Sequence, residues 1–130
     1  MDFQSNVAKL EGLDFKALYQ DDFFLTWDKS EDELKAVLAV ADALRALREN
    51  NKSARIFDSG LGISLFRDNS TRTRFSYASA CNFLGLEEQV FDEGKSQVAH
   101  GETVMETANM ISFMADVIGI RDDMYIGKGH

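Results

Sequence analysis

Three arginines and several hydroxyl side chains fall within the eight residues from Arg67 to Arg74. The apolar run Ile63–Phe66 precedes this segment and residues with helical spacing follow it, so the sequence predicts a strand, a short polar loop and a helix start. A helix N-terminus has backbone N–H groups without intrahelical partners and carries partial positive charge. Guanidinium groups and hydroxyls placed there add donors that suit phosphate oxygens. The segment therefore predicts an anion site, for which we expect a phosphate.

A simpler interpretation of the same segment stays open. The three arginines can be solvated surface charges, and Ser70 and Thr71 can be ordinary N-caps of the helix. The acidic background argues for a special role, because the 130-residue chain has a formal net charge of −8. The same acidic balance argues against nucleic acid as the main partner, since binding to a phosphate backbone needs a basic face.

The composition indicates a globular chain of at most one domain of ordinary size, with 45% hydrophobic residues and ten Phe. Cys81 is the only cysteine, which excludes an intramolecular disulfide and fits a reducing cytoplasm. Its place on an apolar helix stripe predicts a buried thiol, not a nucleophile. No apolar run approaches membrane-spanning length and no secretion signal is evident, so we expect a cytoplasmic chain without a membrane partner. No cofactor and no metal site is predicted.

The first half of the chain shows a helical pattern. Short helical pieces are expected before residue 27, with Phe23-Phe24-Leu25 as an anchor onto the core. Ser30 followed three residues later by Glu33 is a capping box, which predicts a helix that ends at Asn50-Asn51. The predicted apolar stripe of this helix consists of Leu34, Val37, Leu38, Ala41, Leu44 and Leu47.

The second half alternates between strand and helix patterns. Strands are predicted near residues 54–58, 63–66, 89–91 and 117–120, and a surface loop near 92–101. One helix is expected from about Thr71 to Leu84, with Gly85 just beyond its end. Another helix is expected from Glu102, with one buried row of apolar residues and flanking methionines that pack in the core. The buried row consists of Val104, Ala108, Ile111 and Ala115, and the methionines are Met105, Met110 and Met114.

Strands that alternate with helices predict an α/β fold with a Rossmann-like parallel sheet and right-handed crossovers. In such sheets ligands collect beyond the carboxyl ends of the strands. Segment 67–74 and Arg121 each follow a strand, so we expect them to converge at one edge. Residues 1–26 form the expected N-terminal helical segment, and residues 27–130 the α/β domain, which we expect to be truncated before its next unit.

Three segments of this sequence resemble one enzyme family. Phe66–Arg74 is similar to the carbamoyl phosphate signature of the aspartate and ornithine carbamoyltransferases, whose core is Ser-Thr-Arg-Thr-Arg. Gly94–Thr103 resembles the mobile loop of the family, and Asp116–Arg121 the strand that delivers a second phosphate-binding arginine. The residues around these segments are most similar to those of the knotted carbamoyltransferases of the YgeW type. The resemblance implies that the α/β fold is a carbamoyl phosphate domain.

The resemblance also implies roles for the residues of the signature. Carbamoyl phosphate would be bound by Arg121 from the neighbouring strand and by the backbone and side chains at the helix start. Arg72 and Arg121 would be the catalytic residues, and Arg74 would organise the loop. The residues that would bind the phosphate group at the helix start are Ser70, Thr71, Arg72 and Thr73.

Further roles are implied for the 94–103 segment. Lys95 and Gln97 would reach into the site of an adjacent subunit, because family members are trimers with active sites at subunit interfaces. Glu102 would hold an arginine of the binding loop, although it can equally serve only to favour the N-terminus of its helix. His100, in a glycine-flanked loop, is interpreted as a solvated residue.

The sequence departs from the family pattern in ways that matter for activity. A His-Pro-x-x-Gln segment and a His-Cys-Leu-Pro segment, both typical of the family, do not occur in it, and the second domain is absent. The chain thus resembles the carbamoyl phosphate-binding part of an enzyme that transfers a carbamoyl group to an amine of an amino acid or related acceptor and releases phosphate. We expect this part alone to be inactive. The alternative is an inactive fragment or interaction module that retains only the phosphate-binding loop.

Overall fold

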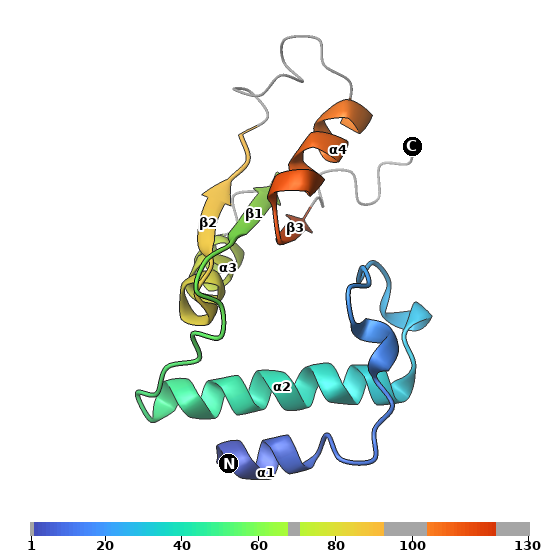
Figure 1. The fold of residues 1–130 in the computed structure, drawn as a ribbon, viewed down its shortest axis with the longest axis vertical. Coiled ribbons are helices and arrows are strands. Elements are labelled where there is room, and N and C mark those ends of the chain that lie inside the picture. The colour runs from blue at the N-terminus through green and yellow to red at the C-terminus, as the bar shows by residue number, and fades with distance from the viewer. Residues whose placement is uncertain (1, 68–70, 93–103, 122–130) are drawn as a thin grey trace. The chain divides into compact units, whose positions relative to one another are not determined.

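A computed structural model describes residues 2–67, 71–92 and 104–121 of the chain (Figure 1). The chain forms two compact units, Met1–Ala54 and Arg55–His130. The predicted boundary between residues 26 and 27 lies inside the first unit.

The first unit is helical, as predicted. Helix α1 (Phe3–Ala8) and the 3-10 turns η1 (Lys16–Leu18) and η2 (Thr26–Asp28) are the expected short pieces, and α2 (Glu31–Glu49) is the long helix. Helix α2 buries a row of small side chains, and α1 packs against this helix. The buried row consists of Ala36, Ala39, Ala43 and Ala46.

The predicted leucine-rich stripe of α2 is wrong in part. Leu38 and Val37 are exposed, and Leu34, Leu44 and Leu47 are only half-buried. Alanine allows a close approach between helix backbones, so the alanine row, and not the leucine row, faces the interior of this unit. The predicted anchor Phe23-Phe24-Leu25 is also wrong, because all three side chains are exposed.

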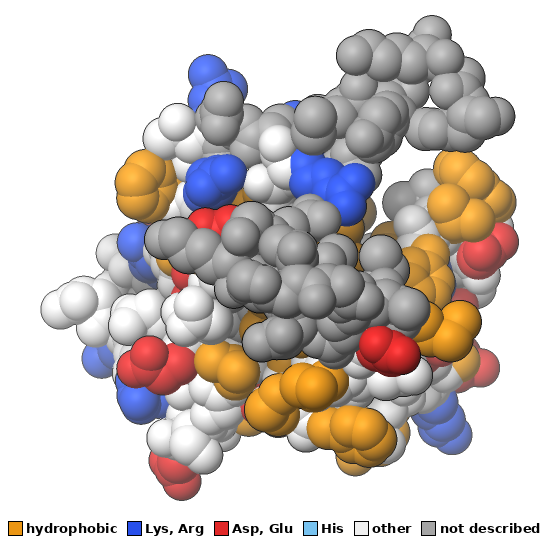
Figure 2. All heavy atoms as spheres, turned by 90° about the horizontal axis from the view of Figure 1, so that it is seen from above, with side chains coloured by type: hydrophobic (Ala, Val, Ile, Leu, Met, Phe, Trp, Pro, Cys, Tyr) orange, Lys and Arg blue, Asp and Glu red, His pale blue; other side chains and the backbone are white. Residues whose placement is uncertain are grey.

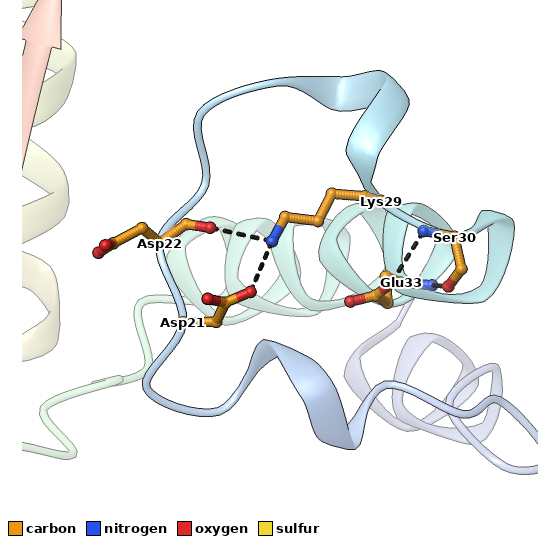
Figure 3. Close-up of polar contacts among 5 residues, drawn as sticks. All are labelled: Asp21, Asp22, Lys29, Ser30 and Glu33. Atoms are coloured by element: carbon orange, nitrogen blue, oxygen red, sulfur yellow. Dashed lines mark hydrogen bonds and ion pairs between the residues drawn. The ribbon is translucent and has the colours of Figure 1, made fainter.

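The capping box at the start of α2 is confirmed. Glu33 N donates to Ser30 Oγ at 3.1 Å, and Ser30 N donates to Glu33 Oε1 at 2.8 Å (Figure 3). Just before the cap, Lys29 Nζ donates to Asp21 Oδ2 and to the Asp22 carbonyl oxygen, which closes the preceding loop onto the helix start. These bonds satisfy N–H groups that would otherwise lack partners.

The box also makes the stability of this unit dependent on pH. The hydrogen bonds from Ser30, that from its backbone first, lower the pKa of Glu33 below its ordinary value of 4.5. Because the folded-state pKa lies below the unfolded-state value, the stabilisation is fully present above about pH 4.5 and is lost as the pH falls through the lowered value.

Replacing Ser30 with Ala should destabilise the first unit by about 1 kcal/mol, because the Glu33 amide loses its acceptor at the N-cap. Urea unfolding at pH 7, followed by the fluorescence of Trp27, measures the change. Gln4→Ala, at an exposed position of α1, is the control and should be nearly neutral, since alanine is the better helix former. Equal shifts in the two variants would contradict the role of the cap.

The second unit contains a three-stranded parallel sheet with the order β2-β1-β3, which confirms the predicted fold class. The strands are β1 (Leu61–Phe66), β2 (Glu87–Val90) and β3 (Val117–Arg121). Helices α3 (Thr71–Leu84) and α4 (Val104–Met114) connect them and lie on opposite faces of the sheet (Figure 1). The predicted start of α4 at Glu102 lies outside the described residues.

The strand predicted at 54–58 is wrong. This segment is irregular, and Phe57 N donates to the Leu84 carbonyl oxygen at 3.0 Å. The carbonyl groups at a helix C-terminus lack intrahelical partners. The segment therefore pairs with the end of α3 and not with a strand.

The C-terminus of α3 is the one predicted. Gly85 has φ +100°, and Gly85 N donates to the Asn82 carbonyl while Leu86 N donates to the Cys81 carbonyl at 2.8 Å. This pattern is a Schellman motif, in which the left-handed residue is usually Gly. The helix thus ends where the sequence places its stop signal.

Burial in the α4–β3 region is lower than predicted. Ile120 is 67% exposed, and Met105, Met110 and Met114 are also exposed. Of the predicted stripe, Ala108 is exposed, and Ile111 and Ala115 are only half-buried. Among the described strands β3 pairs only with β1, so it lies at an edge of the sheet. A sheet of three strands cannot cover all of this apolar surface, and exposed hydrophobic side chains are visible in Figure 2.

Candidate functional site

The carboxyl ends of β1 and β3 lie side by side. Phe66 is the register partner of Arg121, and Arg67 N donates to the Arg121 carbonyl oxygen at 3.0 Å. The two basic segments, which are far apart in the sequence, therefore meet at one edge of the sheet. This convergence was predicted from the alternation of strands and helices, and it is confirmed.

A side-chain hydrogen bond joins the start of α3 to the end of β3. Arg121 Nη1 donates to Thr73 Oγ1 at 2.6 Å, and both residues are half-buried. Arg74 Nη2 donates to the Phe66 carbonyl oxygen at 3.1 Å. One guanidinium group thus reaches from β3 to the first turn of α3, and another reaches from α3 back to the end of β1.

Tyr77 connects α3 to β1 next to this edge of the sheet. Its hydroxyl donates to the Ile63 carbonyl oxygen at 2.8 Å, and its ring meets the ring of Phe66 edge-on, with 5.6 Å between centroids. Burial raises the pKa of Tyr77 to about 12, so the hydroxyl remains a proton donor at neutral pH. Burial also raises the pKa of Cys81, one helical turn further on. The predicted burial of this thiol is confirmed.

An open pocket of about 300 Å³ lies where β1 and β2 end. Arg67 and Arg74 supply positive charge to its wall, and Asp92, just after β2, supplies a carboxylate. The rest of its lining is apolar and comes from Leu65, Phe66, Val90 and Phe91. The end of β1 lines this pocket and also pairs with Arg121, which donates to Thr73.

The predicted site residues divide into two groups. Thr71, Arg72, Thr73, Arg74 and Arg121 lie on the described elements, with the side chains of Thr71 and Arg72 exposed at the first turn of α3. The others lie outside the described residues; they are Ser70, Lys95, Gln97 and Glu102. The roles of both groups stay predictions.

Two residues of the site were not singled out from the sequence. Tyr77 follows Thr73 by one helical turn, and Gly119 precedes Arg121 by two residues, which is the same face of a strand. A glycine inside an apolar strand often marks a close approach of another group. That signal was present at Gly119 and points to the ring that lies on it.

The arrangement provides hydrogen-bond donors and positive charge in one place. Such a site binds an anion and stabilises negative charge that grows during a reaction. Among residues 2–67, 71–92 and 104–121 no group of three or more His, Cys, Asp or Glu is placed to hold a metal ion. None of the helices described is long and apolar enough to cross a membrane.

Sequence comparison gives a match over most of the chain. The profile described as "Aspartate/ornithine carbamoyltransferase, carbamoyl-P binding domain" matches residues 21–130. The chain belongs to the aspartate/ornithine carbamoyltransferase family. It is 71% identical over 113 residues to YgeW of Escherichia coli strain K12, which carries the name of a carbamoyltransferase. It is 41% identical over 100 residues to an ornithine carbamoyltransferase of Parafrankia sp..

These matches cover most of this chain but only part of each relative. The match to YgeW covers 87% of this chain and 28% of YgeW, and the match to the Parafrankia enzyme covers 76% and 32%. The fold agrees with a solved carbamoyltransferase. The aspartate transcarbamoylase of Trypanosoma cruzi, in complex with carbamoyl phosphate and aspartate, superposes with a TM-score of 0.74 at 21% identity, over 82% of this chain and 33% of that one. The resemblance to this family is thus confirmed.

Proposed function

We propose that the sheet binds carbamoyl phosphate at the carboxyl ends of its strands, next to the N-terminus of α3. We further propose that the chain is the carbamoyl phosphate-binding part of a carbamoyltransferase. The observation that carries the proposal is the hydrogen bond from Arg121 Nη1 to Thr73 Oγ1 at 2.6 Å. It holds a guanidinium group of β3 at the N-terminal turn of α3, where backbone amides already favour an anion. Both residues fall within the region that matches the family profile.

In the proposed reaction an amine of an amino acid or a related acceptor attacks the carbonyl carbon of carbamoyl phosphate. The C–N bond forms and the bond between that carbon and the phosphate oxygen breaks. The proton that the amine loses ends on the departing phosphate, which leaves as hydrogen phosphate. Negative charge grows on the departing phosphate, so Arg72 and Arg121 would stabilise the transition state more than the ground state. Ser70, Thr71 and Thr73 would bind the phosphate oxygens. No covalent intermediate on the protein is needed.

The supporting residues have separate proposed roles. Arg74 would hold the loop, since its guanidinium donates to the Phe66 carbonyl oxygen at the end of β1. Glu102 would assist it, and Lys95 and Gln97 would complete the site of a neighbouring subunit in a homotrimer. We propose a cytoplasmic enzyme of amino acid metabolism, without nucleic acid or membrane partners. The net charge of −8 supports the first of these exclusions.

Arg72→Ala is expected to weaken binding of carbamoyl phosphate by about one to two decades. The reason is that a charge-assisted hydrogen bond contributes about 1.5–3 kcal/mol, and each 1.4 kcal/mol is a factor of ten in affinity. Isothermal titration of the 130-residue chain measures the change. Arg48→Ala, on the last turn of α2, is the control for loss of a surface charge. Unchanged affinity in Arg72→Ala would remove this residue from the site.

A turnover assay tests whether this part of the enzyme is inactive alone. The chain is incubated with carbamoyl phosphate and candidate amino acids, and the ornithine carbamoyltransferase of Parafrankia sp. with ornithine is the separate positive control. We expect binding but no carbamoylated product from the chain, because it spans only 32% of that relative. Product from the chain alone would contradict this expectation. Absence of carbamoyl phosphate binding would contradict both the proposed function and its alternative, since both retain the phosphate-binding loop.

A further inference from the structure

One face of α3 lies directly on the sheet. Thr73, Tyr77 and Cys81 follow one another at intervals of four residues and thus form a single row on this helix. Thr73 accepts the hydrogen bond from Arg121, Tyr77 donates to Ile63 in β1, and Cys81 is buried. The row therefore joins the helix to the two strands whose ends form the site.

Two glycines give this row its room. A Cβ atom on Gly119 would lie 2.5 Å from Tyr77 Cε2, and one on Gly62 would lie 2.6 Å from Cys81 Sγ. Neither glycine has the left-handed backbone that only glycine adopts easily. Space, and not backbone conformation, is the reason for glycine at these positions.

The contact between Tyr77 and Gly119 lies next to the proposed phosphate-binding residues, both along α3 and along β3. Along α3, Tyr77 is one turn after Thr73. Along β3, Gly119 is two residues before Arg121 and on the same face. The distance between the tyrosine ring and Gly119 therefore determines the distance between Thr73 and the Arg121 guanidinium group.

We propose that Tyr77 and Gly119 form a positioning pair, in which the ring seated on the glycine backbone sets the distance between the start of α3 and Arg121. This inference rests on the proposed phosphate site. Neither residue touches the ligand; both act through Thr73 and Arg121. In enzymes a misplacement of about 1 Å, caused by a mutation away from the reacting groups, can cost about a hundredfold in rate, so a single methyl group between ring and strand is enough to disturb the site.

The first experiment measures binding of inorganic phosphate to the 130-residue chain by calorimetry. Gly119→Ala should weaken binding about ten- to hundredfold, because the new methyl group lifts the ring and with it Thr73. Tyr77→Phe keeps the ring and should change affinity less than about threefold. Tyr19→Phe, the same chemical change at an exposed tyrosine, is the matched control and should have no effect.

A double variant tests whether ring and glycine act together. Tyr77→Leu alone removes the spacer and should weaken binding about tenfold. In Gly119→Ala combined with Tyr77→Leu the methyl group occupies room that the smaller side chain vacates, so the double variant should bind more tightly than Gly119→Ala alone. Losses that simply add would overturn the proposal, because independent sites show no such coupling.

A ligand-free measurement distinguishes positioning from a purely structural role. The Nε–Hε NMR signal of Arg121, in arginine-labelled protein, reports its guanidinium environment, and Thr73→Val gives the position without the hydrogen bond to Oγ1. In Gly119→Ala the signal should move towards that position. A lower unfolding temperature with an unmoved signal would overturn the proposal. If the unaltered chain fails to bind phosphate, the proposed function falls, while this signal still decides on the pair.

Discussion

Replacement of Arg121 with Gln should lower the affinity of the chain for carbamoyl phosphate about a hundred- to thousandfold, the largest effect expected at the site. The guanidinium group offers a planar fork of donors that can hold two phosphate oxygens at once. Loss of two charge-assisted hydrogen bonds, at about 1.5–3 kcal/mol each, corresponds to two decades or more. Isothermal titration measures the affinity.

The structure makes this a clean substitution. Arg121 pairs with Arg67 through its backbone carbonyl, so the strand register does not depend on the side chain. Arg121→Lys retains the charge but not the fork and should lose only about tenfold. Arg45→Gln, an exposed arginine of α2, is the control. If Arg121→Gln and this control bind alike, the proposed phosphate site is wrong.

The second large effect concerns stability. Gly85→Ala should destabilise the second unit by about 2–5 kcal/mol, since a left-handed backbone costs a non-glycine residue roughly 1–2 kcal/mol and overpacking typically adds 1–3 kcal/mol. Gly85 has φ +100°, and a Cβ atom there would collide with the Phe57 carbonyl oxygen and lie 2.9 Å from Arg55 Cγ. Hydrogen exchange of the α3 amides measures the loss.

Gly12→Ala is the matched control, because it isolates the backbone cost. Gly12 also has a positive φ, +80°, but a Cβ atom added there would meet nothing within 4 Å. We expect the first unit, which contains Gly12, to lose about 1–2 kcal/mol of stability from the left-handed conformation alone, as measured by hydrogen exchange of the α2 amides. A loss at Gly85 no larger than at Gly12 would show that Phe57 moves aside and that the close packing at the end of α3 is not a constraint.

Local signals in the sequence predicted several elements of the fold well. The capping box at Ser30, the glycine stop at Gly85 and the apolar strand before Arg67 are each written in a few neighbouring residues, and each is present in the structure. The meeting of Arg121 with the start of α3 followed from the alternation of strands and helices, which predicts a parallel sheet with its ligands at one edge. Such features depend on the backbone and on adjacent side chains, which a sequence displays directly.

Burial was predicted less well, since it depends on what surrounds an element. The periodicity of α4 and the apolar run of β3 indicate faces suited to a core, yet Ala108 and Ile120 are exposed. β1 is the only described strand beside β3, so this edge of the sheet has little that covers it. Similarly, four alanines of α2 are buried and Leu38 is not, since short side chains permit α1 to approach; the four are Ala36, Ala39, Ala43 and Ala46. Periodicity identifies a face but not its neighbour.

The strand order β2-β1-β3 has a consequence for how the chain gains its binding competence. β2 follows β1 through a single helix, whereas β3 arrives only after β2 and α4 have been passed, so its pairing with β1 closes the longer loop. Arg121 is carried on this late partner. We expect the anion site to form late in folding. The appearance of phosphate affinity in a refolding experiment would then report the pairing of β3 with β1.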